Sequence, residues 1–369
     1  MPHVLTLVEQ FWHKVPGGTA QATERTLAAL LDRNEFTATG LAAAHRPCVD
    51  RRDGGQDGAL RVPDGCRLVH HRLPRPVLYE SWLRLGRPRV DRLLGPDSLF
   101  WASSLIVAPC RRPVVSTVHD LDFLDHPEFL TARGRRFFPL MWDVARRRSD
   151  HFVCPSVAVA EQCRASGVPD ELVSVVPWGV DQPLVAADDA NAVLARSVPS
   201  LPAKFVLLVA PDSPRKNPEG CAAALAATDC PAVIVGSMPE GTHDPFATLG
   251  SPVVRLGPVD ARVLSALYHR ATALLFPSHR EGYGLPVAEA MAHGLPVVTS
   301  RGTATEEVAA GAASLIDPLD HSDIAATLEQ VLNDDAARRS MVAKGLDRAA
   351  ELTWEQTAKG YSEIFGMVL

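Results

Sequence analysis

The sequence predicts an α/β protein with two doubly wound parallel sheets, one in each of two successive domains. Short runs rich in β-branched residues alternate with longer helical patterns in the first half of the chain, and this alternation starts again after an interruption. A chain of 369 residues is also too long to fold around one compact core. We therefore expect an N-terminal domain over residues 1–180, a linker over 181–203 and a C-terminal domain over 204–369.

The first domain contains apolar runs of strand length, separated by turn residues and by helical stretches. Thr19–Leu31 and Ala158–Ala165 have the spacing of helices, and the polar stretch Val49–Gly58 is typical of a surface loop. The expected strands are His3–Val8, Phe36–Gly40, Arg67–Leu73, Ser98–Ala102, Pro113–Val118, His151–Cys154 and Val173–Val176.

The second domain repeats this pattern after a stretch rich in proline and aspartate, which predicts the linker. Residues 320–369 are expected to be almost wholly helical, with Trp354 and Tyr361 as large packing residues, and these terminal helices could pack back on the N-terminal domain. Ligands of open α/β sheets lie at the carboxyl ends of strands, so we expect two facing domains with a cleft between them. The expected strands are Lys204–Ala210, Ala232–Gly236, Val253–Leu256, Ala273–Phe276, Val297–Ser300 and Ala313–Ile316.

The composition is that of an ordinary soluble protein, with 46% apolar and 22% charged residues. No apolar run reaches the roughly 18–20 residues that span a bilayer, and the start, Met1–Glu9, lacks the basic leader of a signal peptide. The seven cysteines include no Cys-x-x-Cys pair, so neither a disulfide framework nor a zinc site is indicated. We expect a cytoplasmic protein.

Charge is shared unevenly between the two halves. Residues 1–180 carry 23 basic and 20 acidic side chains, and residues 181–369 carry 14 and 23. A basic half beside an acidic half indicates different partners for the two. Both net charges are too small to predict nucleic-acid binding.

One segment, Phe276–Val298, carries the most specific chemistry. It has the pattern of a strand, a glycine-rich turn, a short helix and a second strand, with Pro286 suited to the first helical position and Gly294 to the helix stop. Glu281 is expected in the turn and Glu289 in the first turn of the helix. Such a turn binds phosphate through backbone N–H groups, whereas carboxylates accept hydrogen bonds from hydroxyls. A phosphate flanked by two polyols describes a nucleotide sugar; the alternative is a buried helix with incidental glutamates.

Three further loops also follow predicted strands. Gly17 and Gly18 would let the backbone approach a phosphate, or form a plain tight turn. His119 would face the mouth of the cleft, or have a structural role. In the same loop as His119, Asp120 and Asp122 have a spacing that suits a divalent metal ion, although a capping or turn role is commoner for such aspartates.

The last of these loops contains two adjacent cations, Arg215 and Lys216. They could neutralise a diphosphate leaving group, or form a solvated basic turn. Other phosphate motifs fail: a dinucleotide fingerprint would need glycine at Val287, and the chain has no Gly-Lys-Ser/Thr loop. It also has no Gly-x-Ser-x-Gly elbow.

With these residues, the chain resembles the retaining GT-B glycosyltransferases of the "group 1" family. The match is most specific at Phe276–Val298, with its Glu-x7-Glu spacing, and it covers the second domain nearly end to end. Other segments that agree are Pro16–Gly18, Thr117–Asp120, Pro214–Asn217, Leu256–Val259, Ala304–Val308, Asp317–Pro318 and Leu352–Trp354.

The resemblance implies a GT-B architecture of two facing Rossmann-like domains, the first binding the acceptor and the second the nucleotide sugar. Glu281 would hold hydroxyls of the donor sugar, Glu289 the ribose hydroxyls, and His119 the transferred sugar. The family is typically metal-independent, so neither a metal nor another cofactor is expected. The diphosphate would be held by N–H groups of Gly282, Tyr283, Gly284 and Leu285, by Lys216 and Arg215, and by Gly17 and Gly18.

One departure from the family pattern concerns the third loop. Many members carry an arginine a few residues before the lysine, where this chain has Ala210-Pro211-Asp212. Proline cannot bind phosphate through its side chain, so Arg215 must compensate or the cationic clamp is weaker.

The implied function is transfer of a hexose from a nucleoside-diphosphate sugar to a hydroxyl acceptor, with retention of configuration by front-face displacement. Resemblance to mannosyltransferases of cell-envelope polysaccharides favours GDP-mannose as donor. A nucleotide-sugar epimerase and a non-catalytic nucleotide-sugar-binding subunit are the alternatives.

The acceptor is expected to be a glycan, a lipid-linked molecule or a small molecule. The stretch 70–92 mixes six arginines with Tyr79, Trp82, Leu83 and Leu85. Such a surface could rest on anionic lipid, which would place the protein peripherally on the inner face of the membrane. A solvated face with its stems packed on the core is the alternative.

Overall fold

A computed structural model describes residues 1–13, 17–44, 60–211, 213–236 and 243–369. The chain divides into two compact units, each described below by itself. Unit 1 comprises Met1–Gly179 together with Trp354–Leu369, and unit 2 comprises Val180–Thr353. The loop expected at Val49–Gly58 lies outside the described residues.

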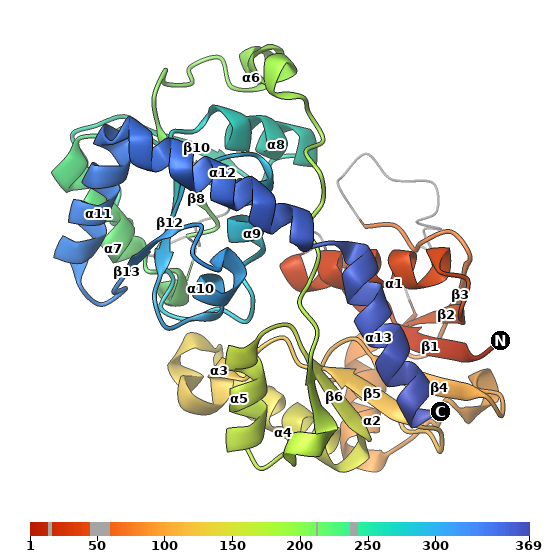
Figure 1. Cartoon of the computed structure of the whole chain (residues 1–369). Coiled ribbons are helices and arrows are strands. Elements are labelled where there is room, and N and C mark those ends of the chain that lie inside the picture. Colours follow the sequence, from red (N-terminus) through yellow and green to blue (C-terminus); the bar gives the residue numbers. More distant parts are fainter. Residues whose placement is uncertain (14–16, 45–59, 212, 237–242) are drawn as a thin grey trace. The chain divides into compact units, whose positions relative to one another are not determined.

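Unit 1 is built on a seven-stranded, wholly parallel sheet with the strand order β3-β2-β1-β4-β5-β6-β7 (Figure 1). All the strands predicted for the first domain are confirmed, with ends shifted by a few residues at most. They are β1 (His3–Leu7), β2 (Thr37–Ala42), β3 (Cys66–His70), β4 (Ser98–Ala102), β5 (Val114–Thr117), β6 (His151–Cys154) and β7 (Val173–Val175).

Helices cover both faces of this sheet because alternate strand residues point to opposite sides. Val4 and Val8 enter a core with α1 (Gly18–Asp32) and the C-terminal helix α13 (Trp354–Val368). Leu5 and Leu7 enter a second core on the other face. The helices of that core are α2 (Arg75–Leu85), α4 (Ala132–Arg148) and α5 (Val157–Ala165), and the short helix α3 (Asp122–Asp125) precedes α4.

The C-terminal helix α13 belongs to unit 1. This agrees with the prediction that the terminal helices could pack back on the N-terminal domain. Tyr361 is buried, as expected of a large packing residue. Its hydroxyl lies 2.8 Å from Thr117 Oγ1 at the end of β5, and this oxygen also accepts the indole N–H of Trp101 at 2.9 Å. Polar groups of α13, β4 and β5 are therefore paired with one another inside the core.

In the basic stretch 70–92, the aromatic side chains that we expect on the surface are instead packed against the core. Trp82 and Leu83 are buried, and Tyr79 stacks on Trp82 with ring centroids 5.9 Å apart. The prediction of a basic–aromatic surface is therefore wrong in its aromatic half: these rings face the core of unit 1 because α2 turns its apolar side to the sheet. Val77 and Leu85 are the large apolar side chains that stay exposed on α2.

Unit 2 is built on a six-stranded parallel sheet with the order β10-β9-β8-β11-β12-β13. Every strand predicted for the second domain is confirmed. They are β8 (Val206–Val209), β9 (Ala232–Val235), β10 (Val253–Gly257), β11 (Ala273–Phe276), β12 (Val297–Ser300) and β13 (Ser314–Ile316).

Helices α7 (Pro218–Thr228) and α11 (His321–Asn333) share one core with this sheet. Residues 181–203, where we expected a linker, instead belong to unit 2 and carry the helix α6 (Ala190–Ser197). Ala190 and Leu194 are buried on that helix, which packs against α8. The remaining helices are α8 (Ala261–Arg270), α9 (Leu285–Ala292), α10 (Ala304–Ala309) and α12 (Asp335–Glu351).

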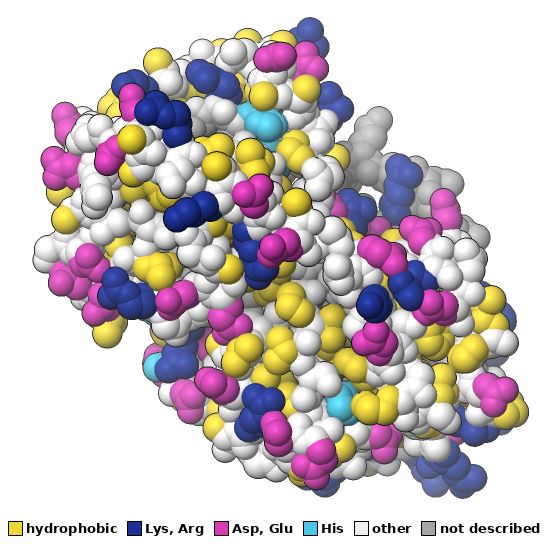
Figure 2. Space-filling model, in the orientation of Figure 1, with side chains coloured by type: hydrophobic (Ala, Val, Ile, Leu, Met, Phe, Trp, Pro, Cys, Tyr) yellow, Lys and Arg dark blue, Asp and Glu magenta, His cyan; other side chains and the backbone are white. Residues whose placement is uncertain are grey.

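Two properties concern the whole described chain: the distribution of charged side chains on its surface and the apolar character of its helices. On the face drawn in Figure 2, basic and acidic side chains are interspersed. Within the described ranges, no helix combines the length and the apolar character needed to cross a membrane.

Candidate active site

The sheet of unit 2 reverses its strand order between β8 and β11, since β9 and β10 lie on one side of β8 while β12 and β13 follow β11 on the other. Connections leaving two such neighbouring strands turn to opposite faces, which opens a crevice at the carboxyl edge. The loop after β8 carries Arg215 and Lys216, and the turn after β11 carries Glu281. The topology therefore brings together Lys216 and Glu281, which are 65 positions apart.

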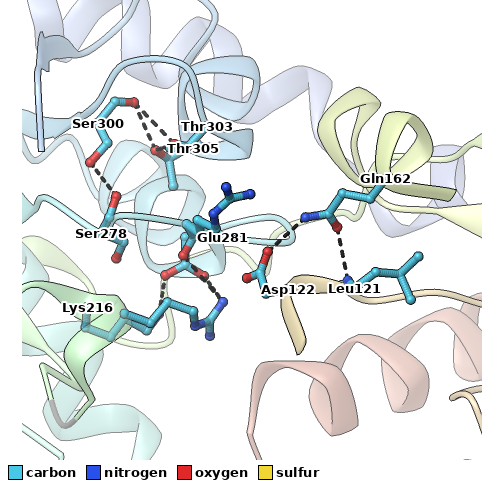
Figure 3. A network of polar contacts seen from close by, with 11 residues as sticks. Leu121, Asp122, Gln162, Lys216, Ser278, Glu281, Ser300, Thr303 and Thr305 are labelled. Atoms are coloured by element: carbon cyan, nitrogen blue, oxygen red, sulfur yellow. Dashed lines mark hydrogen bonds and ion pairs between the residues drawn. The ribbon is translucent and has the colours of Figure 1, made fainter. Parts of the chain in front are cut away.

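Glu281 is the centre of this cluster (Figure 3). Its side chain is 7% exposed and forms an ion pair with Lys216 Nζ at Oε1. Arg215 Nη1 lies 3.5 Å from Oε2 of the same carboxylate and 3.4 Å from the carbonyl oxygen of Arg280. Both carboxylate oxygens of Glu281 thus face a cation.

The electrostatics of the cluster favour a further anion. Burial raises the pKa of Glu281, but the charges of Lys216 and Arg215 outweigh it and hold the pKa below its ordinary value. Lys216 Nζ also lies 4.5 Å from the ring centroid of Phe276, a cation–π contact. Two cations around one carboxylate leave one positive charge in excess, which suits the phosphates of a nucleotide.

Asn217 holds the cationic loop in place. It adopts a left-handed conformation (φ 55°), and its side-chain oxygen accepts the N–H of Gly220 at 3.0 Å, which caps α7. Its side-chain N–H groups donate to the carbonyl oxygens of Pro277 (3.1 Å) and Pro318 (2.7 Å). One amide therefore joins the loop of Lys216 to the end of β11.

A second set of bonds fixes the turn that carries Glu281. The backbone N–H of His279 donates to the carbonyl oxygen of Arg215 at 2.8 Å. The hydroxyl of Ser300 donates to the carbonyl oxygen of Ser278 at 2.6 Å. Thr299 Oγ1 donates its hydrogen to the carbonyl oxygen of Phe276 at 2.9 Å and lies 2.9 Å from Thr305 Oγ1. These hydroxyls connect the ends of β11 and β12 with the start of α10, and Figure 3 shows the contacts of Ser300 with Ser278 and Thr305.

The glycine turn leads into α9, which begins at Leu285, so Pro286 occupies the second helical position. Gly284 has φ 101°, and a Cβ at this position would lie 2.6 Å from Thr305 Cγ2, so the turn requires glycine. The first N–H groups of a helix have no partner within it and lie at its positive end. The side chain of Tyr283 is buried, so only its backbone is suited to binding a ligand.

Glu289 lies one turn later than we expected, in the second turn of α9 rather than the first, because the helix begins at Leu285. Its Oε2 accepts the hydroxyl hydrogen of the buried Tyr268 at 2.8 Å. Burial and the neighbouring carboxylate raise the pKa of Tyr268 well above its ordinary value, so the hydroxyl remains a donor.

His293 fixes the backbone of the same residue. Its Nδ1 lies 2.7 Å from the carbonyl oxygen of Glu289, and its Nε2 lies 2.8 Å from Ser265 Oγ. Burial lowers the pKa of His293 to about 4, so the ring is neutral: Nδ1–H donates to the carbonyl, and Nε2 accepts the Ser265 hydroxyl. Side chains from α8 and from the end of α9 thus fix both the carboxylate and the backbone of Glu289.

In unit 1, His119 lies just after β5, at the carboxyl edge of its sheet. Its Nε2 lies 2.8 Å from the carbonyl oxygen of Ser103, and the ring packs edge-on against Trp178. Burial lowers the pKa of His119 to about 4. The neutral ring must donate from Nε2, which leaves Nδ1 as an acceptor, and Nδ1 is buried without a hydrogen-bond partner in the described part of the chain.

Asp122 has a structural partner. Gln162 Nε2 donates to its Oδ1 at 2.8 Å, and Gln162 Oε1 accepts the N–H of Leu121 at 3.0 Å (Figure 3). Among the described residues, no group of three or more His, Cys, Asp or Glu side chains is arranged to hold a metal ion. These two contacts of Gln162 brace Asp122 and the backbone of Leu121, which is a structural role.

Gly17 and Gly18 also lie at the carboxyl edge of unit 1. Gly17 is the N-cap of α1 and Gly18 its first residue, and both are exposed. A Cβ at Gly17 would meet no atom of the described residues within 4 Å, so their packing does not require glycine there. Val15 and Pro16 of this loop lie outside the described residues.

Two family models match the chain. The model of glycosyl transferases group 1 matches residues 195–348, and that of glycosyltransferase family 4 matches residues 16–182. The chain belongs to the group 1 glycosyltransferase family. The two matched regions of this group 1 glycosyltransferase contain the clusters around Glu281 and His119.

Curated relatives of this group 1 glycosyltransferase match over parts of their length. O-antigen chain mannosyltransferase B of Escherichia coli is 41% identical over 110 residues, 29% of each chain. The serotype-specific mannosyltransferase WbdA of E. coli is 31% identical over 171 residues, 43% of this chain and 21% of WbdA. A D-inositol 3-phosphate glycosyltransferase of Nocardiopsis dassonvillei is 30% identical over 242 residues, 59% of this chain and 56% of the relative. The chain thus spans between about a fifth and just over half the length of these relatives.

Solved structures of other proteins share the fold of this group 1 glycosyltransferase at low sequence identity. Sucrose-phosphate synthase from Thermosynechococcus elongatus superposes with a TM-score of 0.74 at 19% identity, covering 100% of this chain and 99% of that one. Anabaena HepE in complex with UDP-glucose gives 0.75 at 18%, covering all of both chains. WaaG, a glycosyltransferase involved in lipopolysaccharide biosynthesis, gives 0.73 at 15%, covering 98% and 99%. The predicted GT-B fold, with two Rossmann-like α/β domains, is confirmed.

The sequence of this group 1 glycosyltransferase did not reveal three kinds of site residue. Asn217 lies in the family segment Pro214–Asn217 but has no predicted role, although asparagine before proline at a helix start is a capping signal. Ser300 and Thr305 left no signal, since single hydroxyls at strand ends are common. Tyr268 and His293 also leave no signal, because only the three-dimensional structure shows that they contact Glu289.

Proposed function

We propose that this chain transfers a hexose from a nucleoside-diphosphate sugar to a hydroxyl group of an acceptor. The observation that carries the proposal is the cluster of Lys216, Arg215 and Glu281 at the point where the sheet of unit 2 reverses. The cluster supplies an excess positive charge, and the same unit contains the start of α9; both suit a diphosphate. The cluster also contains a carboxylate, which suits the hydroxyl groups of an attached sugar.

Each donor group has a partner in this proposal. Lys216 and Arg215 bind the diphosphate, together with backbone N–H groups of Gly282–Leu285 at the start of α9. Glu281 accepts hydroxyls of the transferred sugar, and Glu289 those of the ribose. Arg215, already 3.5 Å from Glu281, takes the place of the arginine that many family members have near Pro211.

Unit 1 supplies the remaining groups. His119 Nδ1 accepts a hydrogen bond from a hydroxyl group of the transferred sugar. The Gly17–Gly18 turn binds the diphosphate, for which its open backbone is suited.

The reaction proposed is a front-face displacement that retains configuration and needs no metal ion. The bond between C1 of the sugar and the β-phosphate oxygen breaks, and its electron pair stays on the phosphate, whose charge Lys216 and Arg215 stabilise. The acceptor oxygen forms the new bond to C1 from the same face. Its proton passes to the departing phosphate oxygen, so no side chain is required as base.

Mannose is the sugar we propose, with GDP-mannose as donor, because relatives that match this chain include two mannosyltransferases of E. coli. The HepE structure contains UDP-glucose, so UDP-glucose is the competing donor to test. A glycan, a lipid-linked molecule or a small molecule is the proposed acceptor.

We also propose that residues 70–92 contact a membrane. The argument for this contact is the exposed arginines, since the aromatic rings pack against the core of unit 1. Arg87 and Arg92 follow α2 in the chain and are exposed, as is Leu85 at the end of that helix. Basic side chains of this kind are attracted to anionic lipid at the inner face of a membrane.

Product analysis with labelled GDP-mannose and UDP-glucose tests the function. Transfer gives a free nucleoside diphosphate and a glycoside, an epimerase would give a new nucleotide sugar, and a binding subunit would give neither. A thermal-shift panel selects the donor beforehand, because a ligand at 100 times its Kd adds about 2.7 kcal/mol of stability. Failure of every nucleotide sugar to stabilise the chain would overturn the proposal.

A further inference from the structure

A second cluster of charged and titratable side chains lies in unit 1, at the carboxyl ends of β1, β2 and β3. The sheet of unit 1 reverses its order between β1 and β4, as that of unit 2 does between β8 and β11. The turn Glu9–Trp12 and then His13 follow β1, and Arg75 begins α2 after β3. A ligand site is expected at this edge by the same argument from topology.

Glu9 is the buried member of this cluster. Its side chain is 5% exposed, and Oε2 accepts the backbone N–H of Ala43 at 2.8 Å, just after β2. Glu9 also helps to raise the pKa of Tyr79, after the larger effect of burial, and Arg75 opposes it. The carboxylate is therefore fixed in position beneath α2.

Arg75 is held between two groups while half of its side chain, 48%, remains exposed. Its Nε lies 4.0 Å from Glu9 Oε1, beyond hydrogen-bond distance, and its Nη1 lies 3.0 Å from His13 Nε2. A guanidinium only donates, so His13 Nε2 accepts and its Nδ1 carries the hydrogen. Burial and then the charge of Arg75 lower the pKa of His13, consistent with a neutral ring.

The accessible members of the cluster therefore present a guanidinium and an imidazole N–H, both hydrogen-bond donors. Glu9 is nearly inaccessible and orients Arg75 from below. Two donors with a positive charge, at an edge where a sheet reverses, suit an anion with several acceptor oxygens, and a guanidinium matches phosphate in geometry.

We propose that Arg75 and His13 bind a phosphate group carried by the acceptor substrate, with Glu9 as the positioning residue of Arg75. This inference rests on the proposed glycosyl transfer, since it assigns the acceptor to a chemical class: a hydroxyl compound bearing a phosphate or diphosphate. The phosphate belongs either to a soluble sugar phosphate or to a lipid-linked one, and both present the same oxygens to Arg75.

Calorimetric binding tests the proposal without knowledge of the acceptor. The protein is first saturated with GDP or UDP, so that the nucleotide site is filled, and is then titrated with mannose 6-phosphate, with mannose, and with a polyprenyl phosphate in detergent micelles. We expect a phosphorylated probe to bind and mannose not to. Arg75→Gln should weaken that binding roughly tenfold or more, since hydrogen bonds to charged groups are lost.

Matched variants separate the subsite from the fold and from the donor site. Arg84→Gln removes the same charge from the same helix, where Arg84 pairs with Glu80, and should leave probe binding unchanged. Glu9→Gln should weaken probe binding less than Arg75→Gln, and adding it to Arg75→Gln should have little further effect, as expected of a residue that acts through Arg75.

The outcomes are distinct. Arg75-dependent binding of mannose 6-phosphate identifies a soluble acceptor, and Arg75-dependent binding of the micellar probe alone identifies a lipid-linked one. Binding that is equal for mannose and its phosphate, binding that Arg75→Gln does not change, or no binding of either phosphorylated probe overturns the inference. GDP or UDP binding, and its loss in Lys216→Gln, reports on the proposed function independently.

Discussion

The two sheets present buried carboxylates at corresponding edges, but they neutralise them differently. In unit 2, each oxygen of Glu281 faces a cation, Lys216 or Arg215, and the loop that carries these cations is fixed by Asn217. In unit 1, Glu9 accepts a backbone N–H, and Arg75 stays 4.0 Å away with half of its side chain in solvent. The edge of unit 2 is thus assembled before a ligand arrives, whereas the edge of unit 1 keeps its cation available.

Removal of Lys216 should lower the rate of transfer more than any other change, because it removes a cation that pairs with Glu281 and is proposed to bind the diphosphate. Lys216→Ala is expected to lower kcat by about 10²–10³-fold, the usual loss for a group that stabilises developing charge. It also leaves the buried Glu281 with Arg215 alone, so part of the loss could come from misfolding.

The double variant Lys216→Ala/Glu281→Ala separates these two causes, since it removes both charges of the pair. Its free energy of unfolding should lie closer to the original value than that of Lys216→Ala, while kcat stays low. The exposed Lys204, replaced by alanine, serves as control. Near-normal turnover in Lys216→Ala would refute the role given to unit 2.

A second test addresses the rigidity of the unit 2 edge. Gly284→Ala forces alanine to a φ of 101° and brings Cβ to 2.6 Å from Thr305 Cγ2, so the free energy of unfolding should fall by about 3 kcal/mol. Thr305→Ser removes the methyl group that causes the clash. Adding it should recover part of the loss in urea unfolding, and no recovery would indicate that backbone strain alone is responsible.

A third test uses pH to examine the neutral histidine of unit 1. The pKa of His119 is about 4 in the folded protein and near 6.5 when unfolded. The unfolded state therefore binds more protons between these values, and the contribution of His119 to stability is lost as pH falls from 6.5 to 4, by about 3 kcal/mol at most.

His119→Asn should reduce this dependence of the unfolding free energy on pH, measured by urea unfolding between pH 4 and 7. The same change at the exposed His243 should not. An unchanged slope in His119→Asn would mean that the histidine is not buried as a neutral group.

The smallest effect is expected at the ribose carboxylate of unit 2. Tyr268→Phe removes the hydroxyl that donates to Glu289 Oε2 and should raise the Kd of the nucleoside diphosphate about tenfold, with kcat nearly unchanged. In a Glu289→Ala background the same change should have little further effect on Kd. Full additivity would show that Tyr268 does not act through Glu289.

Much of the fold could be predicted because most strands are short, largely apolar runs bounded by turn residues. Two errors have physical reasons. Residues 181–203 belong to unit 2 and include the helix α6, which buries Ala190 and Leu194 and packs against α8. Such a contact cannot be read from a stretch rich in proline and aspartate. Trp82 faces the core rather than the surface because α2 presents one side to the sheet.

The candidate site was predictable only where its residues are contiguous. The turn at Glu281 and the Arg215-Lys216 pair are local signals, and sheet topology then brings them together. Glu9 lies in the turn after β1 and Arg75 at the start of α2, with no shared pattern in the sequence, so only the structure relates them.

The clamp formed by Asn217 has a chemical consequence of its own. An asparagine side chain is commonly lost over time when the backbone nitrogen of the next residue attacks its amide carbon and releases ammonia. Here the next residue is Pro218, whose nitrogen carries no hydrogen, so this ring closure is blocked. The amide that joins two strand ends to a helix is therefore protected against deamidation by this route, and prolonged incubation should give no deamidated form of its peptide.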